Sequence, residues 1–222
     1  MDPRRLNVLL DLDNTIINSL EPQEIKLVNP DFKGFAQTPS PSSFESHFHY
    51  EDMNPFFRVY GRPHLDTFLD FLFEHFNVGV FTAAESEYAL FIVKHFIETK
   101  PGRRVSVIFY RYHVDAGEKR YGDGRIKDLR LLWEHYKIPF FYPQNTILID
   151  DLIDVKETNP YNVFRIKSFD VLKHNKPNED AVQDRELYHV MDTLKQLNQA
   201  YQSQSISITR NKFIPLLYPM AK

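Results

Sequence analysis

The sequence predicts an α/β fold in which a central parallel sheet carries helices on both faces. Short apolar runs of strand length alternate along the chain with amphipathic segments of helix length, and this order is typical of parallel sheets. Several of the apolar runs end directly at an aspartate or a threonine. Because ligands bind at the carboxyl ends of the strands in such sheets, we expect a functional site at that edge.

Six segments have the length and composition of strands. The sequence predicts core strands at residues 6–10, 77–81, 105–110, 146–149 and 162–166, and a further short strand at 56–60. Apolar residues recur at helical spacing between and after these runs, which predicts helices over residues 64–76, 85–97, 128–136 and 184–201. Pro63 stands at the start of the first helix, where proline is favoured.

Two stretches interrupt the alternation. Residues 18–54 lack periodicity and contain a Pro- and Ser-rich run at 37–43, which predicts a loop or flap. Residues 111–126 predict a small β-hairpin insertion, with Gly122-Asp123-Gly124 as its turn. Neither is long enough for a large cap domain. We therefore expect residues 1–203 to form a single domain with an open site, followed by a C-terminal tail at 204–222.

Composition excludes several classes of function. The chain has 222 residues, a net charge of −3 and no cysteine. Disulfides, cysteine-ligated metals and cysteine nucleophiles are therefore excluded. The near-neutral charge argues against nucleic acid as a partner, and two short basic clusters (Arg4-Arg5, and Lys100 with Arg103-Arg104) are typical of a solvated surface. No apolar run approaches the ~20 residues of a membrane span, so we expect an intracellular protein, nuclear or cytoplasmic, with no membrane partner.

Paired aspartates follow two of the predicted strands. Asp11 and Asp13 lie directly after residues 6–10, where one carboxylate can act as a nucleophile and the other as a general acid and base. A turn with helix-capping side chains is the alternative. Asp150 and Asp151 end a wholly apolar strand, and carboxylate oxygens in such a place suit Mg²⁺. Converging carboxylates repel, so they need a cation or shared protons.

Groups suited to phosphate stand at two further positions. Thr82, with Ala83 and Ala84 after it, can offer a hydroxyl and backbone N–H groups to a phosphate, although a helix N-cap is the simpler interpretation. Lys127 precedes a predicted helix and can neutralise phosphoryl oxygens, although a surface lysine is the alternative. His47 and His49 lie close together, but without a third ligand nearby they do not predict a zinc site.

Taken together and in this order, the motifs resemble those of the haloacid dehalogenase superfamily of phosphohydrolases, whose fold has a Rossmann-like parallel sheet. Within it, the chain resembles the small C-terminal-domain phosphatases, also called NLI-interacting-factor-like phosphatases. The resemblance runs from about residue 6 to residue 201. It rests on Asp11-Leu12-Asp13-Asn14-Thr15, Arg62-Pro63-His64-Leu65-Asp66-Thr67-Phe68-Leu69, Phe81-Thr82-Ala83-Ala84 with Tyr88-Ala89, and Lys127-Asp128-Leu129.

The resemblance implies a catalytic mechanism. Asp11 would attack phosphorus and form an aspartyl-phosphate. Asp13 would protonate the leaving serine oxygen and then activate water. Mg²⁺ would be bound by the Asp11 carboxylate, the Asp13 backbone carbonyl and Asp151. Asp150 would orient Lys127 or a metal-bound water.

The resemblance also implies how substrate binds. Thr82, Ala83 and Lys127 would hold the phosphoryl group, and Tyr88 matches an aromatic residue of the family's proline-contacting pocket. The implied substrate is phosphoserine in a Ser-Pro-containing protein, such as the C-terminal domain of RNA polymerase II. Two alternatives stay open: another phosphohydrolase of the superfamily, acting on a nucleic-acid 3′-phosphate or a small phosphometabolite, and a non-catalytic phosphopeptide-binding module.

Several positions depart from the family pattern. Asn14 stands where the family usually has Glu, and Asp151 stands where it usually has Asn. Leu152-Ile153 follows in place of Ser-Pro. Residues 110–114 do not match the usual Arg-Glu-Ser-Cys-like segment near the substrate groove.

Overall fold

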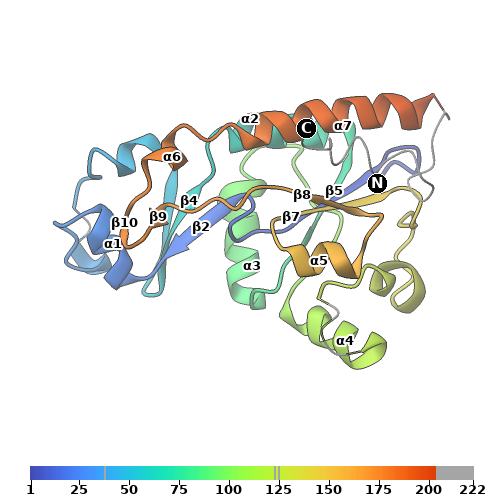
Figure 1. Cartoon of the computed structure of the whole chain (residues 1–222), viewed down its shortest axis with the longest axis horizontal. Helices are drawn as coiled ribbons and strands as arrows, with labels where there is room; N and C mark the ends of the chain where they lie inside the picture. Colours follow the sequence, from blue (N-terminus) through green and yellow to red (C-terminus); the bar gives the residue numbers. More distant parts are fainter. Residues whose placement is uncertain (38, 123, 125, 204–222) are drawn as a thin grey trace.

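A computed structural model describes residues 1–37, 39–122, 124 and 126–203. Its centre is a parallel sheet in the order β6-β5-β1-β7-β8 (Figure 1). The strands are β1 (Asn7–Leu10), β5 (Asn77–Phe81), β6 (Ile108–Phe109), β7 (Thr146–Asp150) and β8 (Val163–Arg165). All five correspond to predicted core strands, although β6 is shorter than expected. The predicted tail at 204–222 lies outside the described residues, and the single-domain assignment stays a prediction.

Alternate residues of the central strands pack against different helices. Val8 and Leu10 of β1 contribute to a cluster that includes α2 (Leu65–His75), α3 (Ser86–Ile92) and α7 (Glu186–Gln202). Leu9 contributes to a second cluster, formed with α4 (Arg111–Tyr121), α5 (Ile153–Thr158) and the π-helical turn Leu131–His135. Because successive strand residues point to opposite faces, the helices cover both faces of the sheet, as predicted. Another π-helical turn, Val93–Ile97, continues α3.

The prediction of a loop or flap over residues 18–54 was wrong. This region forms α1 (Pro22–Val28) and two strands of an antiparallel sheet in the order β2-β4-β3. The strands are β2 (Ile17–Leu20), β3 (Tyr50–Met53) and β4 (Phe57–Gly61). We call this three-stranded sheet the inserted sheet; it lies at the left of Figure 1. Short 3-10 turns occur at Phe35–Gln37 and Glu45–His47.

A buried polar network explains why the sequence pattern of this region was misleading. Arg58 of β4 is fully buried and pairs with Glu45 at 2.8 Å and with Asp52 at 2.7 Å. The Tyr60 hydroxyl donates a hydrogen bond to the same Glu45 carboxylate at 2.7 Å. Charged residues that looked like loop residues therefore lie inside, where buried charges need such partners.

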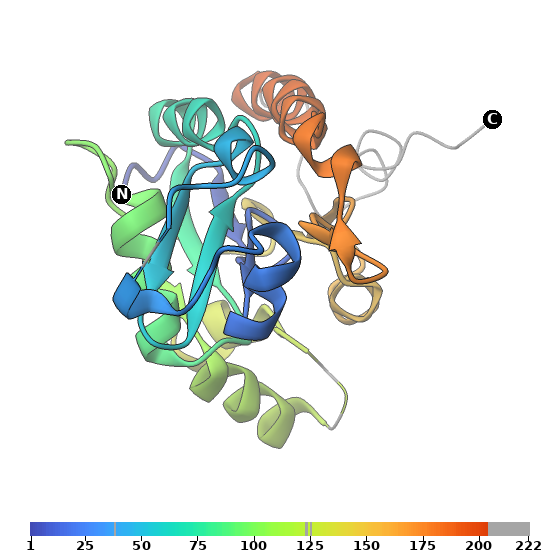
Figure 2. The same cartoon turned by 90° about the vertical axis from the view of Figure 1, so that its left-hand side faces the viewer.

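The C-terminal part packs against both the inserted sheet and the core. A short hairpin, β9 (Leu172–Lys173) and β10 (Lys176–Pro177), precedes α6 (Glu179–Val182). Phe169, Val171 and Ala181 pack in one apolar cluster with Leu20 and Tyr60. Helix α7 then returns along α2, and the two helices lie side by side in Figures 1 and 2.

The predicted hairpin over residues 111–126 was also wrong, because most of this segment forms helix α4. Val114 and Gly117 are its buried residues, and their three-residue spacing places both on the side that packs on Leu131. Gly122, which we assigned to a hairpin turn, is the C-cap of this helix with φ 113°. Glycine at a positive φ is equally typical of a helix C-terminus, so the same residue was compatible with both structures. Figure 2 shows α4 at the lower edge of the molecule.

The basic cluster around residue 100 is internally paired. Lys100 and Arg103 form ion pairs with Asp66 and Asp70 of α2. Arg104 pairs with Glu98 at 3.3 Å. Lys100 and Arg104 are exposed, as predicted for a solvated surface, whereas Arg103 is buried and the prediction was wrong for this residue. Among the described helices, none is both long enough and apolar enough to cross a membrane.

A fully buried arginine at the end of the inserted sheet contacts the segment that precedes the last helix. Arg62 lies just after β4, and its guanidinium binds the Asp184 carboxylate through two nitrogens at 2.9 and 2.8 Å. A third nitrogen donates a hydrogen bond to the Thr15 carbonyl at 2.8 Å. The Phe169 ring lies 5.5 Å from the guanidinium carbon. The loop after β1 is therefore held against the residues that precede α7.

Candidate active site

The candidate site lies at the carboxyl edge of three neighbouring strands. Asp11 follows β1, Thr82 follows β5, and Asp150 is the last residue of β7. These strands are adjacent in the sheet, so their ends meet. A cavity of about 470 Å³ opens there. It is lined by Asp11, Asp13, Asn14, Thr82, Ala83, Ala84, Arg111, Lys127, Asp151 and Leu152.

A compact turn places the residues that follow β1. The backbone N–H groups of Thr15, Ile16 and Ile17 all donate to the Leu12 carbonyl. Asn14 takes the left-handed conformation with φ 58°, which Asn tolerates better than most residues. Its side-chain amide donates a hydrogen bond to Asp170 Oδ1 at 2.5 Å. Both observations give a physical reason for Asn at this departure from the family pattern.

Lys127 is buried between two aspartates. Its ammonium lies 2.5 Å from Asp11 Oδ1 and 2.7 Å from Asp150 Oδ2, and only 1% of the residue is exposed. Burial alone would lower the pKa of Lys127, but the two carboxylates raise it, so the side chain is held as a cation. Asn159, at the end of α5, donates to the Lys127 carbonyl at 3.0 Å and accepts from the Leu129 amide. It thereby fixes the loop that carries the lysine.

Three carboxylates form the candidate metal centre. Oxygen atoms of Asp11, Asp150 and Asp151 lie within 4.8 Å of one another. Burial raises the pKa of both Asp150 and Asp151, and the nearby charge of Asp11 adds to the shift. The Thr15 hydroxyl is 3.1 Å from Asp11 Oδ2 and 3.4 Å from Asp151 Oδ1, so these two oxygens face a common point. This set of hard oxygen donors fits a divalent cation.

Asp150 has a different position from the other two. Its Oδ2 accepts the hydrogen bond from Lys127, and its Oδ1 accepts one from the Leu152 amide at 2.9 Å. Both oxygens are therefore engaged by the protein. Asp150 thus contacts Lys127 directly, and its expected role in orienting this lysine stays a prediction.

Asp13 lies beside Tyr88 rather than beside Lys127. The Tyr88 hydroxyl is 2.5 Å from Asp13 Oδ1 and also contacts the hydroxyl of Ser19 in β2. Burial raises the pKa of Asp13 to about 6, with a further contribution from the charge of Asp11, whereas the hydrogen bond from Tyr88 opposes the shift. A carboxyl group with this pKa can both give and take a proton near neutral pH.

Thr82, Ala83 and Ala84 line the cavity at the end of β5. Thr82 is 1% exposed, and its Oγ1 accepts a hydrogen bond from the Ala84 amide at 3.1 Å. Its backbone N–H donates to the Phe109 carbonyl, which ties this turn to β6. The structure thus brings all the predicted site residues to one place, with Tyr88 joined to it through Asp13.

Sequence reasoning missed several residues of the site. Arg111 lines the cavity from the start of α4, and its Nε lies 3.9 Å from the Glu85 carboxylate. Its place was hidden because the segment was assigned to a hairpin. Thr15 was present in the first motif but was given no role. Asn159 carried no signal, because a single Asn at the end of a short helix is common.

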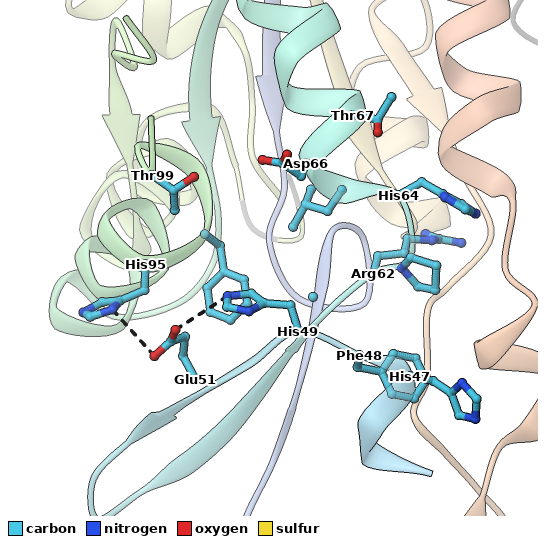
Figure 3. A pocket seen from close by; sticks show the side chains of 14 residues that line it. His47, Phe48, His49, Glu51, Arg62, His64, Asp66, Thr67, His95 and Thr99 are labelled. Atoms are coloured by element: carbon cyan, nitrogen blue, oxygen red, sulfur yellow. Dashed lines mark ion pairs between the residues drawn. The ribbon is translucent and has the colours of Figure 1, made fainter. Parts of the chain in front are cut away.

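A different cavity, of about 490 Å³, lies where the inserted sheet meets α2 (Figure 3). His49 Nε2 and His95 Nδ1 point toward the Glu51 carboxylate at 3.6 and 4.0 Å, and His47 points away from them. None of the predicted catalytic residues lines this cavity. In the described part of the chain, the aspartate cluster is the only set of three such ligands that converges within 4.8 Å.

Comparison with known families agrees with the geometry of the site. Residues 6–205 match the family model described as "NLI interacting factor-like phosphatase". The chain belongs to this family. The match spans all the site residues and confirms the resemblance drawn from the motifs. As a member of the NLI interacting factor-like phosphatases, the chain is a phosphoric monoester hydrolase by family.

Two viral proteins are similar over most of their length. The chain is 36% identical over 190 residues to "Putative CTD phosphatase-like protein 355R" of Invertebrate iridescent virus 6, covering 85% of this chain and 96% of that protein. It is 34% identical over 193 residues to the protein of the same description in Invertebrate iridescent virus 3, covering 85% and 94%. Both identities are high enough to support common family membership.

Solved structures of the phosphatase Fcp1 have the same fold. The structure of Fcp1, described as an essential RNA polymerase II CTD phosphatase, aligns with a TM-score of 0.62 at 18% identity. A fission yeast Fcp1 variant bound to beryllium fluoride aligns with a TM-score of 0.63 at 16% identity. Each alignment covers 91% of this chain, which spans 64% and 65% of the two solved chains. At these identities the likeness concerns the fold, and it confirms the predicted fold class.

Proposed function

We propose that this chain is a Mg²⁺-dependent phosphoserine phosphatase that forms an aspartyl-phosphate on Asp11. The observation that carries the proposal is the buried Lys127, held as a cation between Asp11 and Asp150 at the base of the cavity. A lysine confined there is placed to counter the charge of a phosphoryl group next to the nucleophile. Within the aspartate cluster, Asp11 and Asp151 would supply oxygen donors for the metal.

In this mechanism each residue has a separate task. A carboxylate oxygen of Asp11 attacks phosphorus, while Thr82 and Lys127 bind the phosphoryl oxygens. Asp13 gives its proton to the leaving serine oxygen, which its raised pKa permits. Asp13 then takes a proton from the water that hydrolyses the aspartyl-phosphate. When bound by Asp11, the Asp13 carbonyl and Asp151, Mg²⁺ supplies charge neutralisation and positioning.

The proposed substrate is a protein rather than a small metabolite. No residue of the inserted sheet lines the 470 Å³ cavity, so this sheet does not close over it as a cap would. The relatives' descriptions as CTD phosphatase-like support a Ser-Pro-containing phosphopeptide, such as the C-terminal domain of RNA polymerase II. Tyr88 and Ala83 would contact the peptide beside its phosphoserine. Because these relatives are viral, we propose that the enzyme meets its substrate inside an infected cell.

The first test is hydrolysis of an aryl phosphate by purified protein, with Mg²⁺ and with EDTA. Asp11→Asn should lower kcat by at least about a thousandfold, because it removes the nucleophile. Asp31→Asn, a change at an exposed aspartate in the loop after α1, is the matched control and should retain full activity. Phosphoserine peptides with and without a following proline then test the substrate class.

Two results would contradict the proposal. Full activity of Asp11→Asn would exclude the aspartyl-phosphate mechanism, and equal rates in Mg²⁺ and EDTA would exclude the metal. A folded wild-type protein that hydrolyses neither the aryl phosphate nor any phosphopeptide would instead favour a phosphopeptide-binding module.

A further inference from the structure

A further cavity, distinct from the one in Figure 3, adjoins the candidate active site, and we call it the second cavity. It has a volume of about 710 Å³ and lies where β7 and β8 end and α7 begins. Asp151 and Leu152 line both this cavity and the 470 Å³ active-site cavity, so the two are contiguous at these residues. An extended substrate that leaves the site across Leu152 would therefore enter the second cavity.

Two cations line the second cavity. Arg165 is exposed at the end of β8, and its Nε donates a hydrogen bond to the Asp151 carbonyl at 3.0 Å. Lys167 is exposed two residues later, and within the described part of the chain no carboxylate forms an ion pair with its ammonium. Glu186 also lines the cavity, and its Oε1 accepts a hydrogen bond from the Lys167 backbone N–H at 3.2 Å.

An apolar step separates these cations from the metal centre. Leu152 and Ile153 are 45% and 48% exposed, although they directly follow the aspartate cluster. They occupy the positions where the family usually has Ser-Pro. Exposed apolar side chains beside a polar site can pack against the aliphatic part of a ligand. The surface from Asp151 to Lys167 thus offers an apolar contact followed by positive charge.

We propose that the second cavity binds an additional acidic group, a phosphoryl group or a carboxylate, of the same peptide whose phosphoserine reacts at Asp11. Lys167 is the principal specificity residue, and Arg165 assists while holding the Asp151 backbone. This inference rests on the proposed function. Binding of this acidic group would make the enzyme selective for peptides that carry a second negative charge a few residues from the phosphoserine. The selectivity arises because the peptide's negative charge is attracted to the cations of the second cavity.

The test uses one phosphoserine peptide sequence in three versions. A second position in the peptide carries Gln, Glu or a non-hydrolysable phosphonate analogue of phosphoserine. This position is placed two to five residues before or after the reacting phosphoserine, since an extended chain advances about 3.3 Å per residue. The measured quantity is the ratio of kcat/KM for the acidic peptide to that for the Gln peptide. Because both values come from the same protein, effects on the shared chemistry cancel.

At one spacing, the wild-type ratio should reach about fivefold for Glu, the upper range for an exposed ion pair, and more for the dianionic phosphonate. Lys167→Glu should bring the ratio below one. Lys176→Glu makes the same charge change at an exposed lysine of β10 that does not line the cavity, and it should keep the wild-type ratio. The ratio should approach one at high salt, because screening weakens exposed pairs.

Two results would overturn the inference while the proposed function stands. One is hydrolysis of the Gln peptide with a ratio near one at every spacing. The other is an equal loss of selectivity in Lys167→Glu and Lys176→Glu, which would reflect overall charge. A wild-type protein that hydrolyses none of the peptides would contradict the proposed function, and the inference with it. A larger ratio for Glu than for the phosphonate would assign the site to carboxylates.

Discussion

Tyr88 connects the inserted sheet to the candidate acid and base. Its hydroxyl contacts both Ser19 of β2 and the carboxyl group of Asp13. Its ring packs edge-on against Phe57 with centroids 5.6 Å apart. We predicted Tyr88 as a substrate-contacting aromatic residue, and that role stays a prediction. The hydrogen bond to Asp13 leads us to propose a second task for Tyr88, which is to orient the carboxyl group of the candidate acid and base.

Tyr88→Phe separates these two tasks. The change keeps the ring but removes the hydroxyl, and a hydrogen bond to a charged group contributes about 1.5–3 kcal/mol. We expect kcat for an aryl phosphate to fall at least about tenfold, with KM and the melting temperature little changed. Phe57→Leu, which alters the ring contact and leaves the hydroxyl in place, is the control and should affect kcat less. An unchanged kcat in Tyr88→Phe would show that the hydrogen bond does not support catalysis.

Site residues were predictable from the sequence where a short strand ends in a polar side chain. Asp11, Thr82 and Asp150 directly follow or end apolar runs, and parallel strands bring such ends together. Arg111 and Asn159 were not predictable in this way. The position of Arg111 depends on where helix α4 begins, and that of Asn159 depends on a contact between the end of α5 and the loop of Lys127. No local sequence pattern encodes either arrangement.

At the scale of single elements, Gly79 of β5 leaves no space for a larger residue, because side chains of neighbouring segments lie close to its backbone. A Cβ atom there would lie 2.8 Å from side-chain atoms of both Leu9 and Val107. Real Cβ atoms do not approach other atoms so closely, so neighbouring residues would have to move. This strand leads directly to Thr82, which lines the cavity of the candidate active site.

Gly79→Ala should therefore destabilise the protein. Overpacking of a well-packed core typically costs about 1–3 kcal/mol, and we expect a loss of unfolding free energy in this range. Gly61→Ala in β4 is the matched control, because its added Cβ would meet its nearest atom at 3.4 Å. Urea denaturation of both variants measures the difference. Equal stabilities would show that β5 adjusts without cost.

The buried network of the inserted sheet makes a second element-scale prediction. Burial alone would raise the pKa of Glu45, but hydrogen bonds from the Ser42 amide, Tyr60 and Arg58 lower it below the usual 4.5. Folding therefore favours the carboxylate. Its contribution to stability is present above pH 4.5 and is lost as the pH falls through the folded-state pKa.

Glu45→Gln should cost about 3–5 kcal/mol of unfolding free energy at pH 7, because Arg58 loses a buried partner. The variant should also lose less stability than the wild type between pH 5 and pH 3. Urea denaturation at these pH values measures both effects. Glu179→Gln, at an exposed position of α6, should behave like the wild type. Parallel pH curves for Glu45→Gln and the wild type would contradict the assignment.

The two wrong element assignments have different physical causes. In residues 18–54, Glu45 looked solvent-exposed but is buried with a partner distant in sequence, whereas in residues 111–126 a glycine was compatible with two local structures. Glu45 and Arg58 neutralise each other inside the inserted sheet, and Gly122 ends a helix instead of turning a hairpin. A local sequence pattern shows that a residue is charged and therefore costly to bury. It does not show whether an oppositely charged residue elsewhere in the chain offsets that cost.

At the scale of the whole molecule, the candidate site costs stability. The side chains of Asp11, Asp150 and Asp151 converge, and one lysine ammonium contacts two of them. Burial raises the pKa of Asp150 and of Asp151, and the neighbouring charge of Asp11 adds to both shifts. A cation that binds the folded state alone should therefore stabilise the protein.

Thermal unfolding with and without Mg²⁺ tests this balance. Mg²⁺ at a hundred times its dissociation constant should add about 2.7 kcal/mol to the unfolding free energy of the wild type. In EDTA, Asp151→Asn should be more stable than the wild type because it removes one repelling charge, and its gain from Mg²⁺ should be smaller. Asp154→Asn, an exposed position outside the cluster, is the control. A gain from Mg²⁺ that is the same in all three proteins would place the ion elsewhere.

The buried Arg62 has a consequence for how the chain can be shortened. It joins the carbonyl of Thr15, four residues after the candidate nucleophile, to Asp184 in the segment before α7. A fragment that ended before Asp184 would leave this guanidinium buried without its carboxylate and would lose α7 from the surface of α2. The smallest portion of this protein able to retain an ordered catalytic loop therefore extends through its last described helix, and proteolytic trimming within that region should abolish activity rather than yield a minimal enzyme.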